Sequence, residues 1–192
     1  MANEVLLKVA GVPKQISFAV HAELNAGANN VLEIGGQTEV EMDMDAVVAG
    51  AYENSDQFDF GALRAARYSV MSAIEFSTAP AAGGTINYWL APSDLSGAAV
   101  GNPGGADGTD AAYQGYGADA AAADEAVGQL LYLGSMVVVN DGGDAVQIAW
   151  VGTFAPPARY GQLIIKNSTN QTTITDAVEQ NTVFTPITDE IQ

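Results

Sequence analysis

The most regular pattern of hydrophobic and polar positions lies in the C-terminal third of the chain. Apolar and β-branched residues are grouped there in four segments, residues 129–139, 145–154, 159–168 and 180–191. Segments of this length, separated by turn-forming residues, are typical of β-strands. The DGGD stretch from Asp141 to Asp144 predicts a hairpin turn. Pro156 and Pro157 predict a corner between sheets, because proline cannot donate a hydrogen bond to a strand ladder.

A second pair of strands is predicted in the middle of the chain. Residues 67–78 (RYSVMSAIEFST) are rich in β-branched and aromatic types, which favour strands. Pro80 and the Gly83–Gly84 pair then indicate a turn. Residues 85–91 (TINYWLA) are therefore expected to return as the pairing partner of the preceding strand.

Acidic and apolar residues alternate in a further strand of the N-terminal half. The alternating residues are Glu39, Val40, Glu41, Met42, Asp43, Met44 and Asp45. A period of two predicts a strand with one solvated acidic face and one buried apolar face. Gly35 and Gly36 suit a tight hairpin between this strand and another that begins at Val31.

Two short helices are expected among the strands. The first covers residues 58–66 and turns Phe58, Leu63 and Ala66 inward. The second covers the alanine-rich residues 118–126, because alanine is the best intrinsic helix former. So short a helix needs packing against the rest of the protein to persist.

Residues 92–126 change composition to Gly, Ala, Asp, Ser and Asn, which predicts a long insertion on the surface. Tyr113 and Tyr116 lie in this polar stretch and are expected to be exposed, where tyrosine is a favoured interface residue. Trp89 and Trp150 lie within predicted strands and are expected to pack in the core.

An extended arm is predicted at residues 1–14, where short apolar runs are followed by Gly11 and Pro13. Such an arm could add an edge strand to a partner subunit. Its apolar residues are therefore interface candidates: Val5, Leu6, Leu7 and Val9.

The fold class that these patterns favour is all-β. About eight strands with one long Gly/Ala/Asp-rich insertion suit an antiparallel β-sandwich, and a jelly roll is the arrangement that we expect. No linker or internal repeat interrupts residues 15–192, so this part is predicted to be one domain.

The charge balance narrows the possible partners. Six Lys and Arg residues face 23 Asp and Glu residues, which gives a formal net charge of −17. Nucleic-acid binding is not expected, because it requires clusters of basic residues that neutralise phosphates. The basic residues are also scattered along the sequence, so no basic face for a membrane surface is predicted.

Residues that could carry catalysis or hold a cofactor are scarce. There is no cysteine, and His21 is the only histidine, so a nucleophilic triad has at most one imidazole to use and a multi-histidine metal site has no second one. No G-x-S-x-G motif surrounds any serine. Carboxylates are so abundant that no single pair indicates a glycosidase. We therefore predict no enzymatic activity, no catalytic residues and no cofactor.

Calcium is the most plausible ion, because it prefers carboxylate and carbonyl oxygens. The loop residues that could bind it are Asp107, Asp110, Asp141 and Asp144. Their DGTD and DGGD surroundings lack the spacing of an EF-hand and are more typical of turns. Turn formation is the interpretation that we favour, so no metal site is predicted.

Several linked segments resemble small virion proteins of tailed bacteriophages. The segments are residues 67–93, 101–117, 151–169 and 180–192, and the likeness extends from about Ala65 to the C-terminus. The likeness is one of general residue pattern across these linked segments, and it carries no catalytic motif.

The resemblance implies a head decoration, or cement, protein. Such a protein binds the major capsid protein on the outer surface of the assembled capsid, and often forms a homotrimer. The acidic charge agrees with an exterior location, because densely packed DNA inside a head would repel it. Two alternatives remain open: a tail or fibre-attachment component of the virion, and a glycan-binding β-sandwich module.

Overall fold

The computed structural model describes residues 13–20, 32–34, 36–62, 64–97, 101–117, 119–141, 145–175 and 180–187. Residues 1–12 of the predicted arm, with Val5, Leu6, Leu7 and Val9, lie outside the described residues. The elements are β1 (Ile16–Ala19), β2 (Thr38–Glu41), β3 (Tyr52–Asn54), β4 (Phe58–Asp59), β5 (Arg67–Ile74), β6 (Thr85–Ser93), the 3-10 helix η1 (Pro103–Gly105), α2 (Ala120–Ala126), the 3-10 helix η2 (Val127–Gln129), β7 (Leu131–Val137), β8 (Gln147–Phe154), β9 (Tyr160–Ser168) and β10 (Asn181–Ile187).

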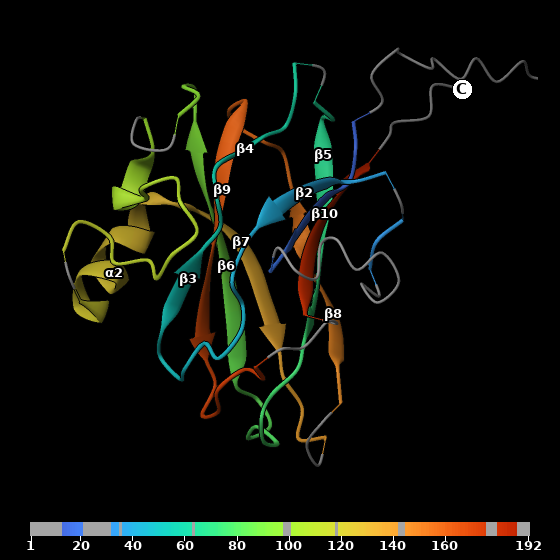
Figure 1. Ribbon diagram of the computed structural model, residues 1–192, viewed down its shortest axis with the longest axis vertical. Helices are drawn as coiled ribbons and strands as arrows, with labels where there is room; N and C mark the ends of the chain where they lie inside the picture. Colours follow the sequence, from blue (N-terminus) through green and yellow to red (C-terminus); the bar gives the residue numbers. More distant parts are fainter. Residues whose placement is uncertain are drawn as a thin grey trace, which may run out of the picture.

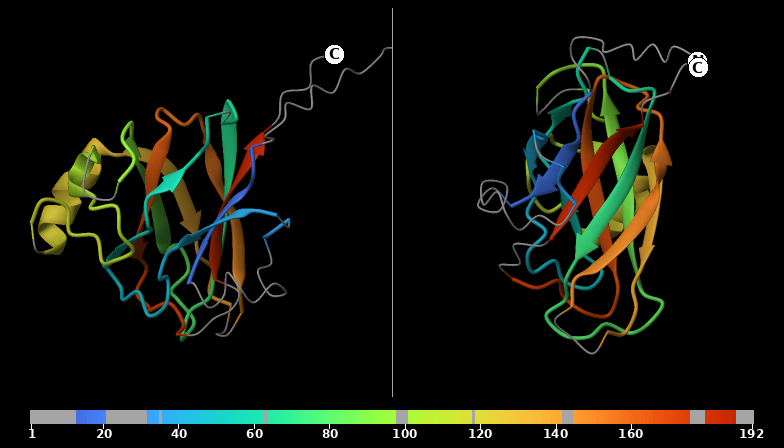
Figure 2. Two further views of the ribbon diagram at one scale, coloured as in Figure 1. Left: turned by 45° about the horizontal axis from the view of Figure 1, so that its top comes forward. Right: turned by 90° about the vertical axis from the view of Figure 1, so that its right-hand side faces the viewer.

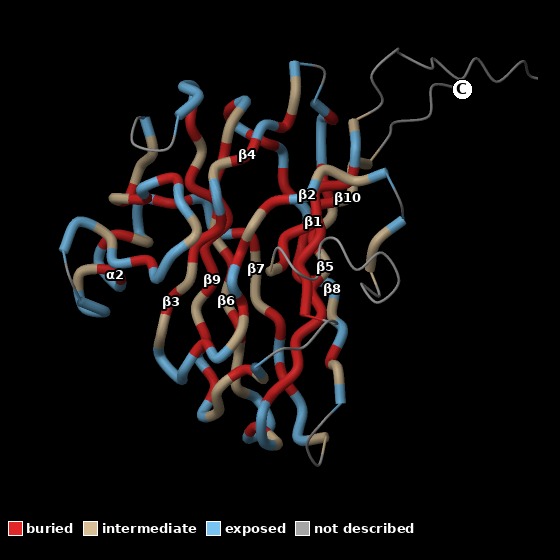
Figure 3. Tube along the Cα trace, in the orientation of Figure 1, coloured by how far each residue is buried: buried red, intermediate tan, exposed pale blue. Residues whose placement is uncertain are grey.

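The strands form two sheets, in agreement with the all-β fold that we expect (Figure 1). The first sheet has the order β2-β1-β10-β5-β8, and the second has the order β3-β9-β6-β7 with β4 also paired to β9. The main hydrophobic core draws buried side chains from both sheets, among them Phe18, Tyr88 and Phe184. Buried positions run along the strands of both sheets in Figure 3. Of the helices in the described part of the chain, none is long and apolar enough to cross a membrane.

Antiparallel pairing is nested along the chain. The innermost pair is β6 with β7, and outside it lie β5 with β8, β3 with β9 and β1 with β10. The insertion predicted at residues 92–126 begins with the last two residues of β6 and otherwise lies in the connection of the innermost pair, between β6 and β7. The other pairs join strands that are far apart in the sequence, so the fold depends on long-range contacts.

Two predicted pairings are wrong. β5 and β6 are not partners, because β5 lies in the first sheet between β10 and β8, whereas β6 lies in the second. β7 and β8 likewise belong to different sheets, so the stretch from Asp141 to Asp144 does not join a hairpin. Crossing between sheets lets consecutive strands bury their apolar faces against each other through the core instead of side by side. Pro156 and Pro157 lie, as predicted, where the chain passes from one sheet to the other.

The predicted hairpin at Gly35 and Gly36 is also wrong. Residues 32–34 form no strand, and β2 pairs with β1 in parallel. The side chain of Gln15 holds residues 32–34 instead: its amide nitrogen donates to the carbonyl of Leu32 at 3.1 Å, and its amide oxygen accepts from the backbone N–H of Ile34 at 3.0 Å. A side-chain amide therefore holds this segment in place of the backbone hydrogen bonds of a strand pair.

The alternation predicted for residues 39–45 is confirmed. Val40, Met42 and Met44 are buried in the main core, whereas Glu39 and Asp43 are exposed. The ladder itself is shorter than this pattern, since β2 ends at Glu41.

Residues 58–66 form no helix, contrary to the prediction. Phe58 begins the short strand β4, and Phe58 and Phe60 are both buried. Their rings lie 4.8 Å apart edge to face, within an aromatic cluster of the main core. Ala65 is buried and Ala66 is exposed, while Leu63 lies outside the described residues. Aromatic packing at a period of two thus decides the local structure.

The backbones of β7 and β8 approach closely, although the two strands end different sheets. A Cβ added at Gly134 would lie 2.3 Å from the carbonyl oxygen of Val151, and one added at Gly152 would lie 2.4 Å from that of Leu133. Gly134 also has a φ of +144°, which side chains disfavour. The two sheets therefore meet along this side through a pair of glycines.

Alanine at either glycine should destabilise the protein. For Gly134→Ala and Gly152→Ala we expect the free energy of unfolding to fall by about 1–3 kcal/mol, because a methyl group would press on the opposite backbone. Gly128→Ala is the matched control, since nothing lies within 4 Å of a Cβ there, and it should change stability by less than about 0.5 kcal/mol. Chemical denaturation measures all three, and equal stability of the three variants would contradict the close approach.

Candidate interaction surface

A row of exposed apolar side chains follows the side of the molecule where β7 and β8 meet. Its members, which we call the β7–β8 strip, are Leu131, Tyr132, Val137, Val139, Ile148 and Trp150. Trp150 is 62% exposed and Val137 is 61% exposed, which is high for side chains of this kind. Single exposed apolar residues are ordinary, whereas several large ones on two strands that approach this closely are typical of a binding surface. Figure 2 (right) shows β8 at the margin of the first sheet.

Two β-bulges set the direction of these side chains. In β8 the register skips Val151, because Val70 pairs with Gly152 while Met71 pairs with Trp150. In β7 the register skips Leu133 in the same way. Both skipped residues point into the main core. A bulge shifts the inward and outward alternation by one residue, so apolar side chains on either side of it turn to solvent.

The β7–β8 strip carries no charge. Residues 126–140 contain no Asp, Glu, Lys or Arg, and neither do residues 145–158. The whole chain has a formal net charge of −17, so two uncharged segments of this length are a local exception. Desolvating its members on contact with another molecule costs little, because none of them is ionised. The Asp141 carboxylate beside its end already accepts from the side chain of Gln147.

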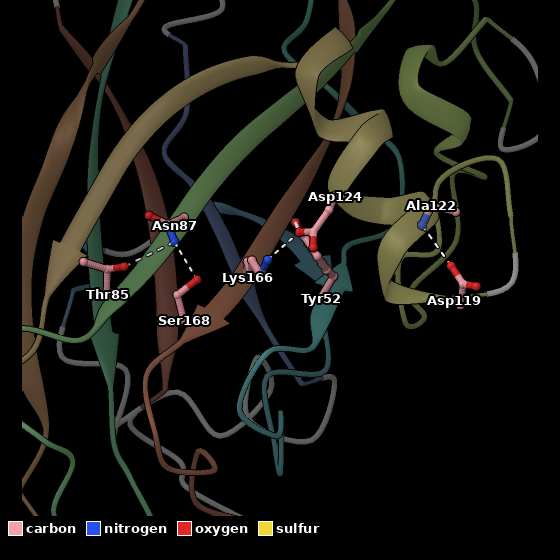
Figure 4. A network of polar contacts seen from close by, with 8 residues as sticks. All are labelled: Tyr52, Thr85, Asn87, Asp119, Ala122, Asp124, Lys166 and Ser168. Carbon is pink, nitrogen blue, oxygen red and sulfur yellow. Dashed lines mark hydrogen bonds and ion pairs between the residues drawn. The ribbon is translucent and has the colours of Figure 1, made fainter.

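Polar contacts hold the aromatic end of the strip. Tyr132 and Ser135 share a short hydrogen bond between their hydroxyl groups, and the Ser135 hydroxyl also donates to the side-chain oxygen of Asn87. The Tyr132 ring lies 5.6 Å from the ring of Trp89, measured between centroids. Asn87 is held in turn by the hydroxyls of Thr85 and Ser168 (Figure 4). These contacts orient the ring of Tyr132 in the structure without a partner.

The junction between β7 and β8 is closed by the side chain of Gln147. Its amide oxygen accepts from the backbone N–H of Val139 at 2.9 Å, and its amide nitrogen donates to the Val139 carbonyl at 2.9 Å. The same nitrogen donates to Asp141 at 2.8 Å. Gln147 thus satisfies both backbone groups of Val139, as a strand partner would.

The predicted roles of the two tryptophans have different outcomes. Trp89 packs, partly buried, against a second apolar cluster, in agreement with the prediction. Trp150 was expected in the core and is exposed, because the adjoining bulge places it on the outer face. The position of Trp150 within a strand did not indicate which face it occupies. The one sequence feature that could have indicated its exposure is the absence of charged residues around it.

The insertion packs on the outer face of the second sheet, on the side away from the first sheet (Figure 1). Its second apolar cluster joins Tyr52 and Ile164 from the sheet to Ala123 and Leu130 of the insertion. The predicted alanine-rich helix is confirmed as α2, and Asp119 caps it by accepting from the backbone N–H of Ala122 at 2.9 Å.

Asp124 ties α2 to the sheet (Figure 4). Its carboxylate accepts short hydrogen bonds from the ammonium group of Lys166 in β9 and from the hydroxyl of Tyr52 in β3. The ammonium group also lies 4.7 Å from the centroid of the Tyr52 ring. Hydrogen bonding to Lys166, then to Tyr52, holds the pKa of Asp124 below its usual range.

The two tyrosines of the insertion differ in exposure. Tyr113 was expected to be exposed and is 4% exposed, because its ring joins the second apolar cluster and its hydroxyl donates to the carbonyl of Gly104 at 2.5 Å. Tyr113 is therefore no longer an interface candidate. Tyr116 is exposed, and its hydroxyl donates to Gln129 at 2.9 Å. The insertion has a core of its own, which its polar composition concealed.

Carboxylates from separate segments come together beside β2 and β3. This acidic group consists of Glu41, Asp43, Glu53, Asp56 and Asp110. The backbone N–H of Asp43 donates to the Asp110 carboxylate at 2.9 Å, and the backbone N–H of Asp110 donates to Asp56 at 2.9 Å. Burial, followed by the charges of Asp110 and Asp43, raises the pKa of Glu53 to about 8. Burial also raises the pKa of Asp110 to about 6, against a backbone hydrogen bond that lowers it.

Of the four calcium candidates, the three that the structure describes have separate partners. Asp107 accepts from the backbone N–H of Thr109 at 3.0 Å, as in a turn, and Asp110 belongs to the acidic group. Asp141 contacts Gln147 at the end of β7, and Asp144 lies outside the described residues. Across the described ranges, no three acidic, histidine or cysteine side chains are arranged to hold a metal ion. His21 also lies outside these ranges.

Comparisons with known proteins give no relative. No protein-family model, no curated protein and no solved structure matches the chain. The residues and their arrangement are therefore the basis for any functional assignment.

Removing the Asp124 carboxylate should loosen α2. Asp124→Ala leaves the hydroxyl of Tyr52 and the ammonium group of Lys166 without this acceptor, so we expect the free energy of unfolding to fall by about 1 kcal/mol. Amide hydrogen exchange in Ala120–Ala126 should become several-fold faster. Glu125→Ala, an exposed change on the same helix, is the control, and equal protection of α2 in the two variants would refute this anchor.

Neutralising Glu53 should stabilise the protein at alkaline pH. Between pH 4.5 and about 8 the folded state keeps a proton on Glu53 that the unfolded chain has lost, so the stability of the wild type falls as pH rises through this window. Glu53→Gln removes this dependence and should raise the free energy of unfolding at pH 8 by about 1 kcal/mol, with a smaller difference at pH 5.

The measurement is denaturant unfolding of both proteins across this pH range. Glu39→Gln removes the same charge from an exposed position of β2 and is the control. A gain from Glu53→Gln that is as large at pH 5 as at pH 8 would contradict the assignment.

Proposed function

We propose that this chain is a structural virion protein that binds the outer surface of an assembled phage capsid and stabilises it by protein-protein contacts. The observation that carries the protein-binding part is the β7–β8 strip, an uncharged apolar surface on a strongly acidic protein. The capsid as partner follows from the resemblance of residues 67–93, 101–117, 151–169 and 180–192 to small virion proteins.

The charge supports an exterior position. A protein with a formal net charge of −17 is repelled by densely packed DNA, whereas on the outside of a shell its charge meets screening solvent. Binding there requires no reactive residue. A ligand that binds only the assembled shell stabilises it by mass action, and many weak contacts add through multivalency.

We also propose that the fold is a jelly-roll β-sandwich. The nested antiparallel pairs from β6/β7 outward to β1/β10 support it, because a jelly roll is a long antiparallel ribbon rolled into two facing sheets. β2 and β4 are then additions to the eight-stranded arrangement expected from the sequence. Viral capsid proteins and lectins both use this architecture.

A glycan-binding module is the second candidate, because the rings of Trp150 and Tyr132 are exposed. Sugar rings stack on such faces but also need convergent polar groups that fix their hydroxyls. The neighbours of these rings in the strip are Val137, Val139 and Ile148, and the hydroxyl of Tyr132 is engaged by Ser135. The composition of the strip therefore favours a protein partner.

Co-sedimentation with capsids tests the proposal. Purified protein is mixed with undecorated capsids of the phage that encodes it, and with the same capsids already decorated as the control. We expect saturable binding with a fixed ratio to the capsid subunits, together with an increased melting temperature of the shell.

A variant that lacks residues 1–14 tests the predicted arm in the same assay and should bind more weakly. Absence of saturable binding by the full chain at any salt concentration would remove the capsid proposal. A shift of the melting temperature by soluble glycans would favour the lectin alternative instead.

A further inference from the structure

We propose that the β7–β8 strip is the contact surface between copies of this chain. The inference builds on the proposed function, in which the protein acts by binding other subunits, and it names the partner of this particular surface. It rests on three features of the strip: its lack of charged members, its aromatic residues and the close backbone contact between the strands that carry it.

The lack of charge selects the partner. Two copies each carry a formal charge of −17, so they repel each other wherever their acidic surfaces approach. Residues 126–140 and 145–158 place no ionised side chain of their own in a contact made through the strip. This surface is therefore where two like-charged copies meet at the lowest electrostatic cost.

A foreign partner would favour a different surface. Proteins that recognise a strongly acidic partner gain affinity and association rate from complementary basic residues, which the acidic group and the exposed acids of β2 would attract. On the uncharged strip such a partner would gain nothing from its charge. The strip fits an equally uncharged and apolar surface, which a second copy provides by symmetry.

The residues of the strip are suited to a stable contact. Tryptophan and tyrosine are enriched among the residues that contribute most to binding, and the strip presents Trp150 and Tyr132 beside aliphatic side chains. Both lie next to a bulge whose position is set by the contact of Gly134 and Gly152 with the opposite backbones. Because the strands are fixed beforehand, little conformational entropy is lost when copies associate.

Sedimentation velocity over a wide range of protein concentration tests the inference. The wild type should associate reversibly, and Val137→Glu or Ile148→Glu should weaken association at least about tenfold, because each places a charge in the contact. Val48→Glu adds the same charge at an exposed apolar position outside the strip and should associate as the wild type does. Near-ultraviolet circular dichroism verifies that each variant is folded.

Tryptophan fluorescence gives an independent reading. The chain has two tryptophans, so Trp89→Phe leaves Trp150 as the only one. Its emission should shift to shorter wavelength as protein concentration rises, because the indole leaves water on association. An unchanged spectrum in samples that sediment as oligomers would place the contact elsewhere and overturn the proposal.

The salt dependence separates the two kinds of partner. Contact between like-charged copies through an uncharged surface should strengthen as salt screens their repulsion, whereas binding of a basic partner should weaken. A wild type that is monomeric at all concentrations and salt levels would overturn the inference.

The capsid assay keeps the two proposals distinguishable. Strip variants that become monomeric but still bind capsids support contact between copies through the strip. Absence of capsid binding by the wild type refutes only the proposed function. Strip variants that associate normally but no longer bind capsids would assign the strip to the capsid and overturn this inference.

Discussion

The close contact between the backbones of β7 and β8 is the constraint on which the surface of this protein depends. Each strand ends a different sheet, and at Gly134 and Gly152 no side chain fits between the two backbones. The bulges at Leu133 and Val151 lie at the same place and turn these two residues inward. The alternation beyond each bulge is shifted, and apolar side chains that a regular strand would bury are left in solvent.

The insertion makes the two sheets unequal. Side chains of the second sheet are covered on the inner face by the main core and on the outer face by the second apolar cluster. Asp124, Lys166 and Tyr52 hold the insertion there through charged hydrogen bonds. At the margin beyond the insertion, the strip remains open. The insertion, predicted from the sequence to carry exposed interface residues, therefore covers part of the second sheet, and the exposed apolar surface lies on the bulged strands β7 and β8.

Charge and apolar surface are separated on this protein. Carboxylates gather where β2, β3 and the insertion meet, close enough for burial and mutual repulsion to raise the pKa of Glu53 to about 8. The strip has no charged residue in either of its sequence segments. A protein organised in this way can remain strongly acidic towards solvent while offering one surface on which contact is not opposed by repulsion.

The sequence by itself determined where most of the longer strands lie, because local alternation and turn residues act within a few positions. It was sufficient for the four C-terminal strands, for the buried Val40, Met42 and Met44, for the helix at Ala120–Ala126 and for the acidic charge. Its errors concern short elements, such as the helix expected at residues 58–66, and the partners and faces of strands. The pairings of β5 and β8, the burial of Tyr113 and the exposure of Trp150 were decided by tertiary structure.

The physical reason is the range of the interactions. A period of two identifies a strand, but the choice between a neighbour in the same sheet and one across the core depends on contacts between residues far apart in the chain. A single extra residue in a bulge exchanges the inner and outer faces of a strand without changing its composition. Residue types thus determined that this chain is a β protein with two uncharged apolar segments. The close approach of Gly134 and Gly152 to the opposite backbones, which only the tertiary structure shows, decided which side chains of these segments face solvent.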